Sequence, residues 1–389
     1  MYNFTFDVPV KILFGKDSIK GLADEILKYG KRVLLCYGGG SIKKIGLYDE
    51  VVQQLTQKGL FYRELSGISP NPRIEEVEAG IECVRKHKLD FILPVGGGST
   101  IDCAKAIAAG ALYTGSPWDL ITRKAPIGSV IPVGAVLTLA ATGSEMNCGS
   151  VISNPATKEK LGFGVPAMMP KFSVLDPSYT FTVPREHTAA GIADIMSHTF
   201  ENYFSLNDGA FFQDRCAEAV LKTCITYGPL AIRQPNNYEA RANLMWAGTW
   251  AINGLLSRGK QTSWSVHPME HELSAFYDIT HGVGLAILTP HWLRHILNSA
   301  TVHKIADYGT AVWNVPPEGE PYTRAEAAIS KTAAFFKSLG IPMTLREAGI
   351  GSEYLETMAE AAAQHCGGTI CGFQELTAND ILAIYKAAL

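Results

Sequence analysis

The 389-residue sequence predicts an α/β domain with a parallel sheet, followed by an all-helical domain. In the first 180 residues, apolar runs of strand length alternate with amphipathic helical patterns. This alternation is typical of a parallel sheet that helices cover on both faces. After about Pro184, long helical patterns follow one another with little strand signal. We therefore place the boundary in the turn LDPSYTFTVPRE and expect domains at 1–182 and 183–389.

The strands expected in the first domain are short and nearly all apolar, as strands buried on both faces are. They are KRVLLCYG, LDFILPVGG, VIPVGAVLT and KFSVLD. KILFG, near the start of the chain, fits an edge position. Between the strands, the patterns SIKKIGLYDEVVQQLTQKG and PRIEEVEAGIECVRKHK have the spacing of amphipathic helices.

The second domain is predicted from five long helical patterns. They are HTAAGIADIMSHTFENYF, FFQDRCAEAVLKTCITYG, YEARANLMWAGTWAINGLLS, RAEAAISKTAAFFKSLG and LTANDILAIYKAA. Glycine and proline punctuate this half at 228–230 and at 314–321. No internal repeat is visible.

Composition and charge exclude several classes of protein. Hydrophobic residues make up 47% of the chain and charged residues 18%, as in a compact globular protein. The net charge is −3 without any run of lysine or arginine, so we expect no nucleic-acid partner. The first residues lack a charged region followed by a long apolar stretch, so we expect no signal peptide, and no apolar run reaches membrane-spanning length. Eight scattered cysteines without a CxxC pair are typical of reduced thiols, so we expect a cytoplasmic protein.

Four residues suggest a metal site. Asp194 and His198 lie four residues apart in ADIMSHTFENYF and therefore share one face of the expected helix. His267 opens HPMEHEL, and His281 follows fourteen residues later in DITHGVG. One carboxylate and three imidazoles form a ligand set that suits zinc or ferrous iron.

Three glycine-rich stretches follow expected strands: YGGGSIKK (37–44), PVGGGSTIDCAK (94–105) and LAATGSEMN (139–147). Any one of them alone is most simply a tight turn. Glycine at a strand end also lets a phosphate reach bare N–H groups at the start of the next helix. Parallel strands bind ligands beyond their carboxyl ends, so the three loops together predict a nucleotide site. None of them matches the GxGxxG fingerprint or the P-loop pattern.

A rival hypothesis uses some of the same residues. His267, Glu270 and His271 spell HxxEH, the pattern in which a metallopeptidase binds zinc with two histidines and activates water with glutamate. Pro268 would be compatible with the first turn of such a helix. This hypothesis leaves Asp194, the other histidines and all three glycine loops without a role. A non-catalytic nucleotide-binding protein is a third possibility, which the intact ligand set disfavours.

The motifs resemble those of a known family over nearly the whole chain, thinning after about residue 300. They are ILFGK, YGGGSIKK, LSGISPNPR, VGGGSTIDCAK, TLAATGSEMN, LDPSYTFTVP, ADIMSHTFENYF, RANLMWA, HPMEHELSA and DITHGVGLAILTP. The chain resembles the iron-containing (group III) alcohol dehydrogenases, and within them the clostridial butanol dehydrogenases and the broad-range bacterial NADPH-dependent aldehyde reductases. The resemblance implies an N-terminal Rossmann-like domain, a C-terminal helical domain and an active site in the cleft between them. It also implies hydride transfer between NAD(P)H and a short- to medium-chain aldehyde or primary alcohol.

The resemblance also implies roles for individual residues. It makes Asp194, His198, His267 and His281 the ligands of one divalent metal, Fe²⁺ or Zn²⁺. It makes Gly96, Gly97, Gly98 and Ser99 the pyrophosphate loop. The further cofactor-binding residues that we expect are Gly38, Gly39, Gly40, Ser41, Asp102, Thr138, Thr142, Asn147, Lys160 and Tyr179, the last through its backbone near the nicotinamide.

His271 is the expected catalytic residue, because it lies one helical turn after His267 on the same face. Its two candidate roles, relaying a proton and orienting a ligand or the cofactor, have equal weight. Met146, Asn147, Trp264 and Phe276 are the candidates for the wall of the substrate pocket. No arginine lies in those segments to pair with a substrate carboxylate, so we expect linear aldehydes such as butanal.

The choice of nucleotide is expected to depend on the first glycine loop. In the NAD-preferring relatives that the chain resembles, an aspartate stands where this chain has Gly39. Here bare N–H groups, the Ser41 hydroxyl, Lys43 and Lys44 favour the 2′-phosphate of NADPH. Both lysines can also point to solvent, and some butanol dehydrogenases with the same YGGGSIK stretch use NADH. NADP is therefore the favoured cofactor and NAD the alternative.

The start of the chain predicts a homodimer. YNFTFDV and KILFG both have strand signals, and an exposed strand edge must be covered. We expect a second copy of the chain to cover it. The resemblance to the family also implies a dimer through this edge.

Overall fold

The structure, a computed structural model, describes residues 1–205, 209–262 and 264–389. It consists of two compact units. The sheet unit comprises Asp7–Val183 and Pro235–Thr249, and the helical unit comprises Met1–Phe6, Pro184–Gln234 and Trp250–Leu389. The main division thus lies one residue from the predicted boundary.

Two short segments lie in a different unit from the one expected. Met1–Phe6 belongs to the helical unit, where the Tyr2 N–H donates to the Gly259 carbonyl at 3.0 Å. Pro235–Thr249 belongs to the sheet unit, where Met245 packs in a buried cluster with Leu137 and Leu175. Helical periodicity shows that a helix has an apolar face, but it does not show which core buries that face.

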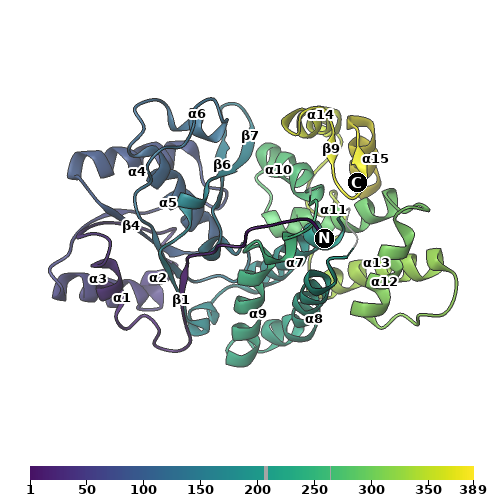
Figure 1. Cartoon of the computed structure of the whole chain (residues 1–389), viewed down its shortest axis with the longest axis horizontal. Coiled ribbons are helices and arrows are strands. Elements are labelled where there is room, and N and C mark those ends of the chain that lie inside the picture. Colours follow the sequence, from purple (N-terminus) through teal and green to yellow (C-terminus); the bar gives the residue numbers. More distant parts are fainter. Residues whose placement is uncertain (206–208, 263) are drawn as a thin grey trace. The chain divides into compact units, whose positions relative to one another are not determined.

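The sheet unit contains a six-stranded parallel sheet in the order β1-β8-β5-β4-β2-β3. Figure 1 labels two of these strands, β1 and β4. In that order the strands are Lys11–Phe14, Phe172–Leu175, Gly134–Leu137, Phe91–Gly96, Arg32–Cys36 and Phe61–Leu65. The predicted α/β fold class is confirmed. KILFG forms the edge strand β1, as expected.

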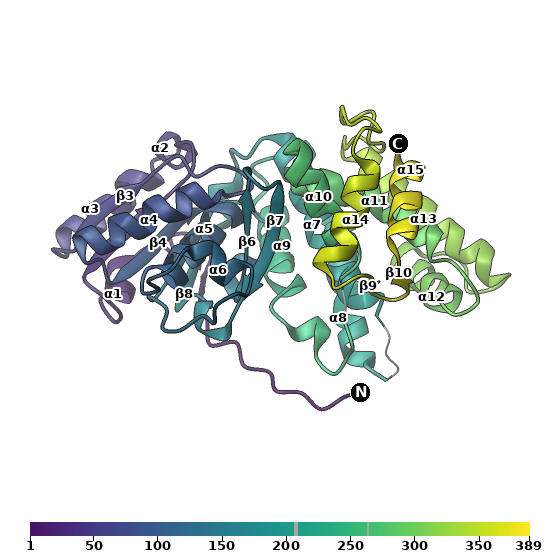
Figure 2. The same cartoon turned by 90° about the horizontal axis from the view of Figure 1, so that it is seen from above.

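Helices cover both faces of this sheet, as predicted. They are α1 Leu22–Ile26, α2 Ser41–Lys44, α3 Leu47–Gln57, α4 Ile74–His87, α5 Gly98–Gly110 and α6 Pro117–Ile121, and α9 Tyr238–Ala251 also packs in this unit through Thr249. Along β2, Leu34 and Cys36 enter the core under α4, α5 and α6, and Val33 and Leu35 enter the core under α1 and α3. Figure 2 shows α4, α5 and α6 together over one face of the sheet.

Several local predictions for this unit were wrong. The single helix expected over 41–59 is two helices, because Gly46 has a φ of 76° and separates α2 from α3. The charged edge strand β3 and the antiparallel pair β6 Gly149–Asn154 and β7 Glu159–Gly164 were not expected. YNFTFDV is not a strand in the structure, since residues 1–10 form no ladder with the described part of the chain. Short 3₁₀ helices complete the unit: η1 Ser144–Met146, η2 Pro166–Met168 and η3 Pro177–Thr180.

The helical unit is built around α7 Arg185–Tyr203, which is buried from Thr188 to Tyr203. The other helices are α8 Phe211–Arg233, η4 Leu255–Ser257, α10 Val266–Tyr277, α11 His281–His295, α12 Val302–Trp313, α13 Pro321–Ser338, α14 Leu355–His365 and α15 Ala378–Ala388. A small hairpin pairs β9 Ile370–Cys371 with β10 Glu375–Leu376. A helix end was expected at 228–230, but α8 continues through Pro229 to Arg233. None of the described helices is long and apolar enough to span a membrane.

Candidate metal centre and phosphate loops

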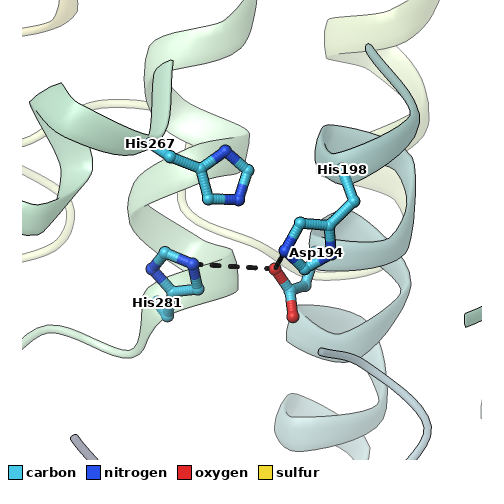
Figure 3. A group of neighbouring side chains, drawn as sticks. All are labelled: Asp194, His198, His267 and His281. Atoms are coloured by element: carbon cyan, nitrogen blue, oxygen red, sulfur yellow. Dashed lines mark ion pairs between the residues drawn. The ribbon is translucent and has the colours of Figure 1, made fainter. Parts of the chain in front are cut away.

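The structure brings together the four predicted metal ligands, all within the helical unit (Figure 3). α7 supplies Asp194 and His198, α10 supplies His267, and α11 supplies His281. One ligand atom of each residue lies within 4.8 Å of the others. Asp194 Oδ1 lies 3.6 Å from His198 Nε2 and 3.7 Å from His281 Nε2. The spacing of four residues therefore places both α7 side chains on one face, as predicted.

The chemistry of these side chains fits a divalent ion. His267 Nε2 is buried and has no hydrogen-bond partner among the described residues, which is costly unless a ligand occupies its lone pair. Burial lowers the pKa of His198 well below its ordinary value, so this ring is neutral, the form that coordinates metals. With one carboxylate and three neutral imidazoles, the set would have a net charge of +1 around a divalent ion.

Glu201 orients His267, a role that the sequence analysis missed. Its carboxylate accepts the backbone N–H groups of Ser265, Val266 and His267 at 2.8, 2.8 and 3.0 Å. It also lies 2.9 Å from His267 Nδ1, so the imidazole presents Nε2 to the site. Glu201 thus caps the start of α10 and sets the tautomer of a ligand. The sequence signal was its place seven residues after Asp194, on the same helical face.

Glu270 has the equivalent role for His281. Its Oε2 pairs with His281 Nδ1, and its Oε1 accepts the Ser274 hydroxyl. His281 therefore directs Nε2 toward Asp194. Gly284 makes room for this carboxylate, because a Cβ there would lie 2.7 Å from Glu270 Cγ. Carboxylate–imidazole–metal arrangements of this type fix ring orientation and raise ligand basicity.

This placement of Glu270 does not support the HxxEH peptidase hypothesis. A water-activating glutamate needs a carboxylate that reaches solvent and substrate. Glu270 is fully buried, and both of its oxygens have partners.

Close packing positions α11 against α7. A Cβ at Gly282 would lie 2.0 Å from the carbonyl oxygen of Ala190, so only glycine allows this approach. His281, the first residue of α11, is thereby held beside Asp194, one turn further along α7. The glycines of DITHGVG therefore contribute to the metal centre through backbone proximity.

His271, the predicted catalytic residue, is partly exposed, and its ring lies 5.7 Å from that of His281 and 6.4 Å from that of His267. Trp264, a predicted pocket-wall residue, packs against the rings of His267 and His198 at 4.5 and 5.6 Å. Phe276 packs against Tyr354 at 5.3 Å. The other two predicted wall residues, Met146 and Asn147, lie in the sheet unit.

The three glycine loops follow β2, β4 and β5, which are adjacent parallel strands. Their carboxyl ends therefore share one edge of the sheet. Gly96, Gly97, Gly98 and Ser99 form the turn into α5, whose first backbone N–H groups are available to an anion. A Cβ at Gly98 would lie 2.1 Å from Thr142 Oγ1, so this glycine allows the third loop to pack against the start of α5.

A buried lysine, which the sequence analysis did not single out, ties this third loop to α5. Lys105 Nζ donates to Ser144 Oγ at 2.9 Å, Asn147 Oδ1 at 3.1 Å and the Gly149 carbonyl at 2.9 Å. Burial lowers the pKa of Lys105 to about 8, so at neutral pH its three N–H groups match three acceptors. Asp102 accepts the Ser144 hydroxyl at 2.5 Å and the Val151 N–H at 3.0 Å, and burial raises the pKa of its carboxyl.

The remaining predicted cofactor residues lie in or near these loops. The Asn147 amide shapes the third loop, since it bonds Lys105, the Gly143 carbonyl and the Gly149 N–H. Thr138 donates its N–H to the Gly96 carbonyl at 3.0 Å. Lys160 is buried on β7, and Tyr179 lies in η3, which follows β8.

Comparison with known proteins gives concordant matches. The family described as iron-containing alcohol dehydrogenase matches residues 9–177, and its C-terminal domain family matches residues 188–389. The chain is 55% identical to NADH-dependent butanol dehydrogenase A of Clostridium acetobutylicum over 99% of both chains. It is 40% identical to the NADPH-dependent aldehyde reductase YqhD of Escherichia coli over the full length of both.

Solved structures of two relatives have the same fold. The crystal structure of E. coli YqhD superposes with a TM-score of 0.95 at 39% identity. That of NADH-dependent butanol dehydrogenase A from Thermotoga maritima superposes with a TM-score of 0.95 at 38% identity. Each match covers 100% of this chain and 99% of the other.

Proposed function

The chain belongs to the iron-containing alcohol dehydrogenase family, and we propose that it reduces short- to medium-chain linear aldehydes to primary alcohols with a nicotinamide dinucleotide. The cluster of Asp194 and three histidines, of which His281 is partly exposed, is the observation on which this proposal rests. The names of the relatives, butanol dehydrogenase and aldehyde reductase, support the substrate class. The proposed metal is one Fe²⁺ or Zn²⁺, because the ligand set suits both.

When bound, the divalent ion supplies Lewis acidity at the carbonyl oxygen and the reduced nicotinamide supplies the hydride. The protein's part is to hold these groups. Glu201 and Glu270 keep the Nε2 atoms of His267 and His281 directed at one point. Trp264 packs against the imidazole rings of His198 and His267. We propose that His271, beside the ligands but more exposed, passes a proton to the alkoxide oxygen or orients the ligands around it.

In the sheet unit, we propose that the backbone N–H groups at Gly97, Gly98 and Ser99 bind the pyrophosphate at the start of α5. Asp102, Thr138, Thr142, Asn147, Lys160 and Tyr179 are proposed to line the rest of the cofactor. For two of these, the hydrogen bonds suggest an indirect contribution: Asn147 and Asp102 shape the third loop through Lys105 and Ser144.

We also propose that the protein is a homodimer. Tyr2, Phe4 and Phe6 expose 59%, 50% and 41% of their surface, which is unusual for aromatic side chains of a monomer. β1 pairs with β8 and lies at the edge of the sheet. Light scattering of the purified protein at micromolar concentration should give the mass of a dimer, and a monomer there would refute this part of the proposal.

The function is tested with protein purified without oxygen and assayed for metal and for butanal-dependent oxidation of NADH and NADPH. The proposal predicts a bound divalent ion and oxidation of at least one of the two nucleotides. A strong preference for charged 2-oxo acids over butanal would contradict the substrate class. Cleavage of peptides without any effect of nucleotide would contradict the whole proposal.

A further inference from the structure

Two exposed cysteines flank a short turn at the end of α14. Cys366 is the first residue after this helix, and Cys371 ends the strand β9. The chain turns between them at Gly367 and Gly368, whose φ angles are 87° and 113°. Although Cys366 is exposed as a residue, its thiol is partly desolvated, and this desolvation raises its pKa. The negative charges of Glu272 and of an ionised Cys371 raise this pKa further, so both groups lie within electrostatic reach of the Cys366 thiol.

The two cysteines differ in how firmly they are held. Cys371 lies between Ile370, which is 1% exposed, and Gly372, where a Cβ would lie 2.0 Å from Ser265 Oγ. The other thiol lies in the exposed stretch 364–368, which backbone hydrogen bonds to the last turn of α14 hold in place. Tertiary packing therefore fixes Cys371, whereas the turn with the other thiol depends mainly on local hydrogen bonds, which open more easily.

The same segment contacts α10 in two places. α14 packs against α10 (Figure 1). Ser265, which Gly372 contacts, immediately precedes α10 and lies two residues before His267. At the other end of the turn, His365 Nδ1 lies 2.9 Å from Oε1 of Glu272, whose side chain on α10 is 2% exposed. The position of the turn is thus linked to the helix that carries a candidate metal ligand.

We propose that Cys366 and Cys371 are a redox-sensitive thiol pair, which small disulfides such as glutathione disulfide oxidise to an intramolecular disulfide that loosens α10. In this exchange, the Cys371 thiolate attacks one sulfur of the small disulfide, and a small thiolate leaves. The Cys366 thiol then loses its proton and attacks the Cys371 sulfur, and a second small thiolate leaves. Two protein thiols are thereby oxidised, and one small disulfide is reduced to two thiols. Cys366 takes the second step because its raised pKa disfavours the thiolate.

The disulfide should act on α10 through His365. Drawing Cys366 toward β9 pulls His365 away from Glu272, which removes an imidazole from beside a buried carboxylate. Such a loss is costly, so α10 should loosen, and the metal centre that includes His267 should lose its ion more readily. This consequence rests on the proposed function, whereas the thiol pair itself does not. Exposed disulfides are readily reduced, so the change should be reversible.

The first measurement is the mass of the cysteine-containing peptides after incubation of the purified protein with glutathione disulfide. We expect a bond between Cys366 and Cys371, no attached glutathione, and reversal by dithiothreitol. Cys366→Ser should leave glutathione on Cys371, because no second thiol remains to displace it. In the wild type, thiols that stay reduced, a stable glutathione adduct, or a bond from either cysteine to another thiol would overturn the proposal.

The second measurement is the rate at which the bound divalent ion passes to a chelator. The oxidised wild type should release it about two- to tenfold faster than the reduced protein, a smaller effect than that of altering a group bonded directly to a ligand. His365→Gln should reproduce the faster release without oxidant, and Cys371→Ser should not respond to oxidant. Cys216→Ser, at a partly exposed thiol of α8, is the matched control and should respond as the wild type does.

The outcomes of the two measurements separate this inference from the proposed function. Equal release rates from the reduced and oxidised wild type would overturn the effect on α10. An unchanged rate in His365→Gln would overturn the route through Glu272. If the reduced wild type held no divalent ion and oxidised neither NADH nor NADPH, the proposed function would fail. The peptide masses would then still decide whether the thiol pair exists.

Discussion

The candidate metal centre of the helical unit is made of side chains, whereas the three glycine loops at the carboxyl edge of the sheet are made largely of backbone. At the candidate metal centre, the four predicted ligands come from three helices, and two further carboxylates fix two of the rings. At the glycine loops, Gly98 lets the third loop pack against the start of α5, and the buried Lys105 holds that loop in shape. Removing a side-chain functional group should therefore impair binding at the first site, and adding a methyl group to a glycine should impair binding at the second.

The largest expected effect is the loss of a metal ligand. Replacing His267 or His281 by alanine should remove the metal and lower turnover by a factor of about 1,000 or more, since Lewis acidity contributes several kcal/mol. His271→Ala is the matched variant on the same helix. It should keep the metal and lower turnover by roughly 100-fold, in the range of a lost proton-transfer group. A metal-free His271→Ala protein would contradict the ligand assignment.

The next effect concerns the two carboxylates behind the ligands. Glu201→Gln and Glu270→Gln should each weaken metal binding by about 10- to 100-fold while leaving the four ligands in place. Competition with a chelator of known affinity measures this directly. Glu326→Gln, at an exposed pair with Arg294, is a suitable control and should not change metal affinity. If all three variants retained metal equally, the carboxylates would have only a structural role.

Glycine-to-alanine substitutions test how tightly the backbone is packed at the two sites. Gly282→Ala places a Cβ against the rigid Ala190 carbonyl and should destabilise the fold by about 3 kcal/mol. Gly98→Ala meets Thr142, whose Cβ would lie 2.7 Å away and does not move when the side chain rotates, so it should cost about 2 kcal/mol of stability. It should also weaken nucleotide binding. Gly128→Ala, which meets no atom within 4 Å, serves as the control in urea unfolding.

The smallest expected effect is a pH dependence of stability from Lys105. Burial lowers its pKa to about 8 in the folded protein, from an ordinary value of 10.5. The unfolded chain therefore binds more protons between these values, so the contribution of Lys105 to stability rises with pH in this window. Relative to Lys105→Met, the wild type should gain about 2 kcal/mol between about pH 8 and about pH 10. A difference that stays constant or falls with pH would show that the lysine titrates normally.

The elements of the fold that were predicted correctly have strong local signals. The apolar runs became β2, β4, β5 and β8, and the long amphipathic patterns became helices such as α4, α7 and α13. β3, with the sequence FYREL, was missed because an exposed edge strand has no continuous apolar run. The assignment of Pro235–Thr249 to the sheet unit was missed because it depends on tertiary contacts of Met245 and Thr249.

The residues of the candidate sites also divide into those with a local sequence signal and those whose roles depend on tertiary contacts. The proximity of the four candidate metal ligands was predicted because one carboxylate and three imidazoles in these motifs form a set that suits a divalent metal. Glu201 was missed because its role depends on hydrogen bonds to residues that lie 64 to 66 positions away in the sequence. Lys105 was missed because its partners lie 39 to 44 positions away. The hydrogen bonds of Tyr37 and Tyr48 to Glu64 could not be predicted either, since Glu64 lies on a strand that had not been predicted.

The most direct test of the account is the metal content of the wild type and of His267→Ala, measured on the same preparations that are assayed with butanal and reduced nucleotide. We predict one divalent ion per chain and aldehyde reduction in the wild type, and neither in the variant. Removing the ion from the wild type with a chelator should abolish activity, and adding Fe²⁺ or Zn²⁺ should restore it. Full activity in metal-free wild-type protein, or an unchanged metal content in His267→Ala, would contradict the account.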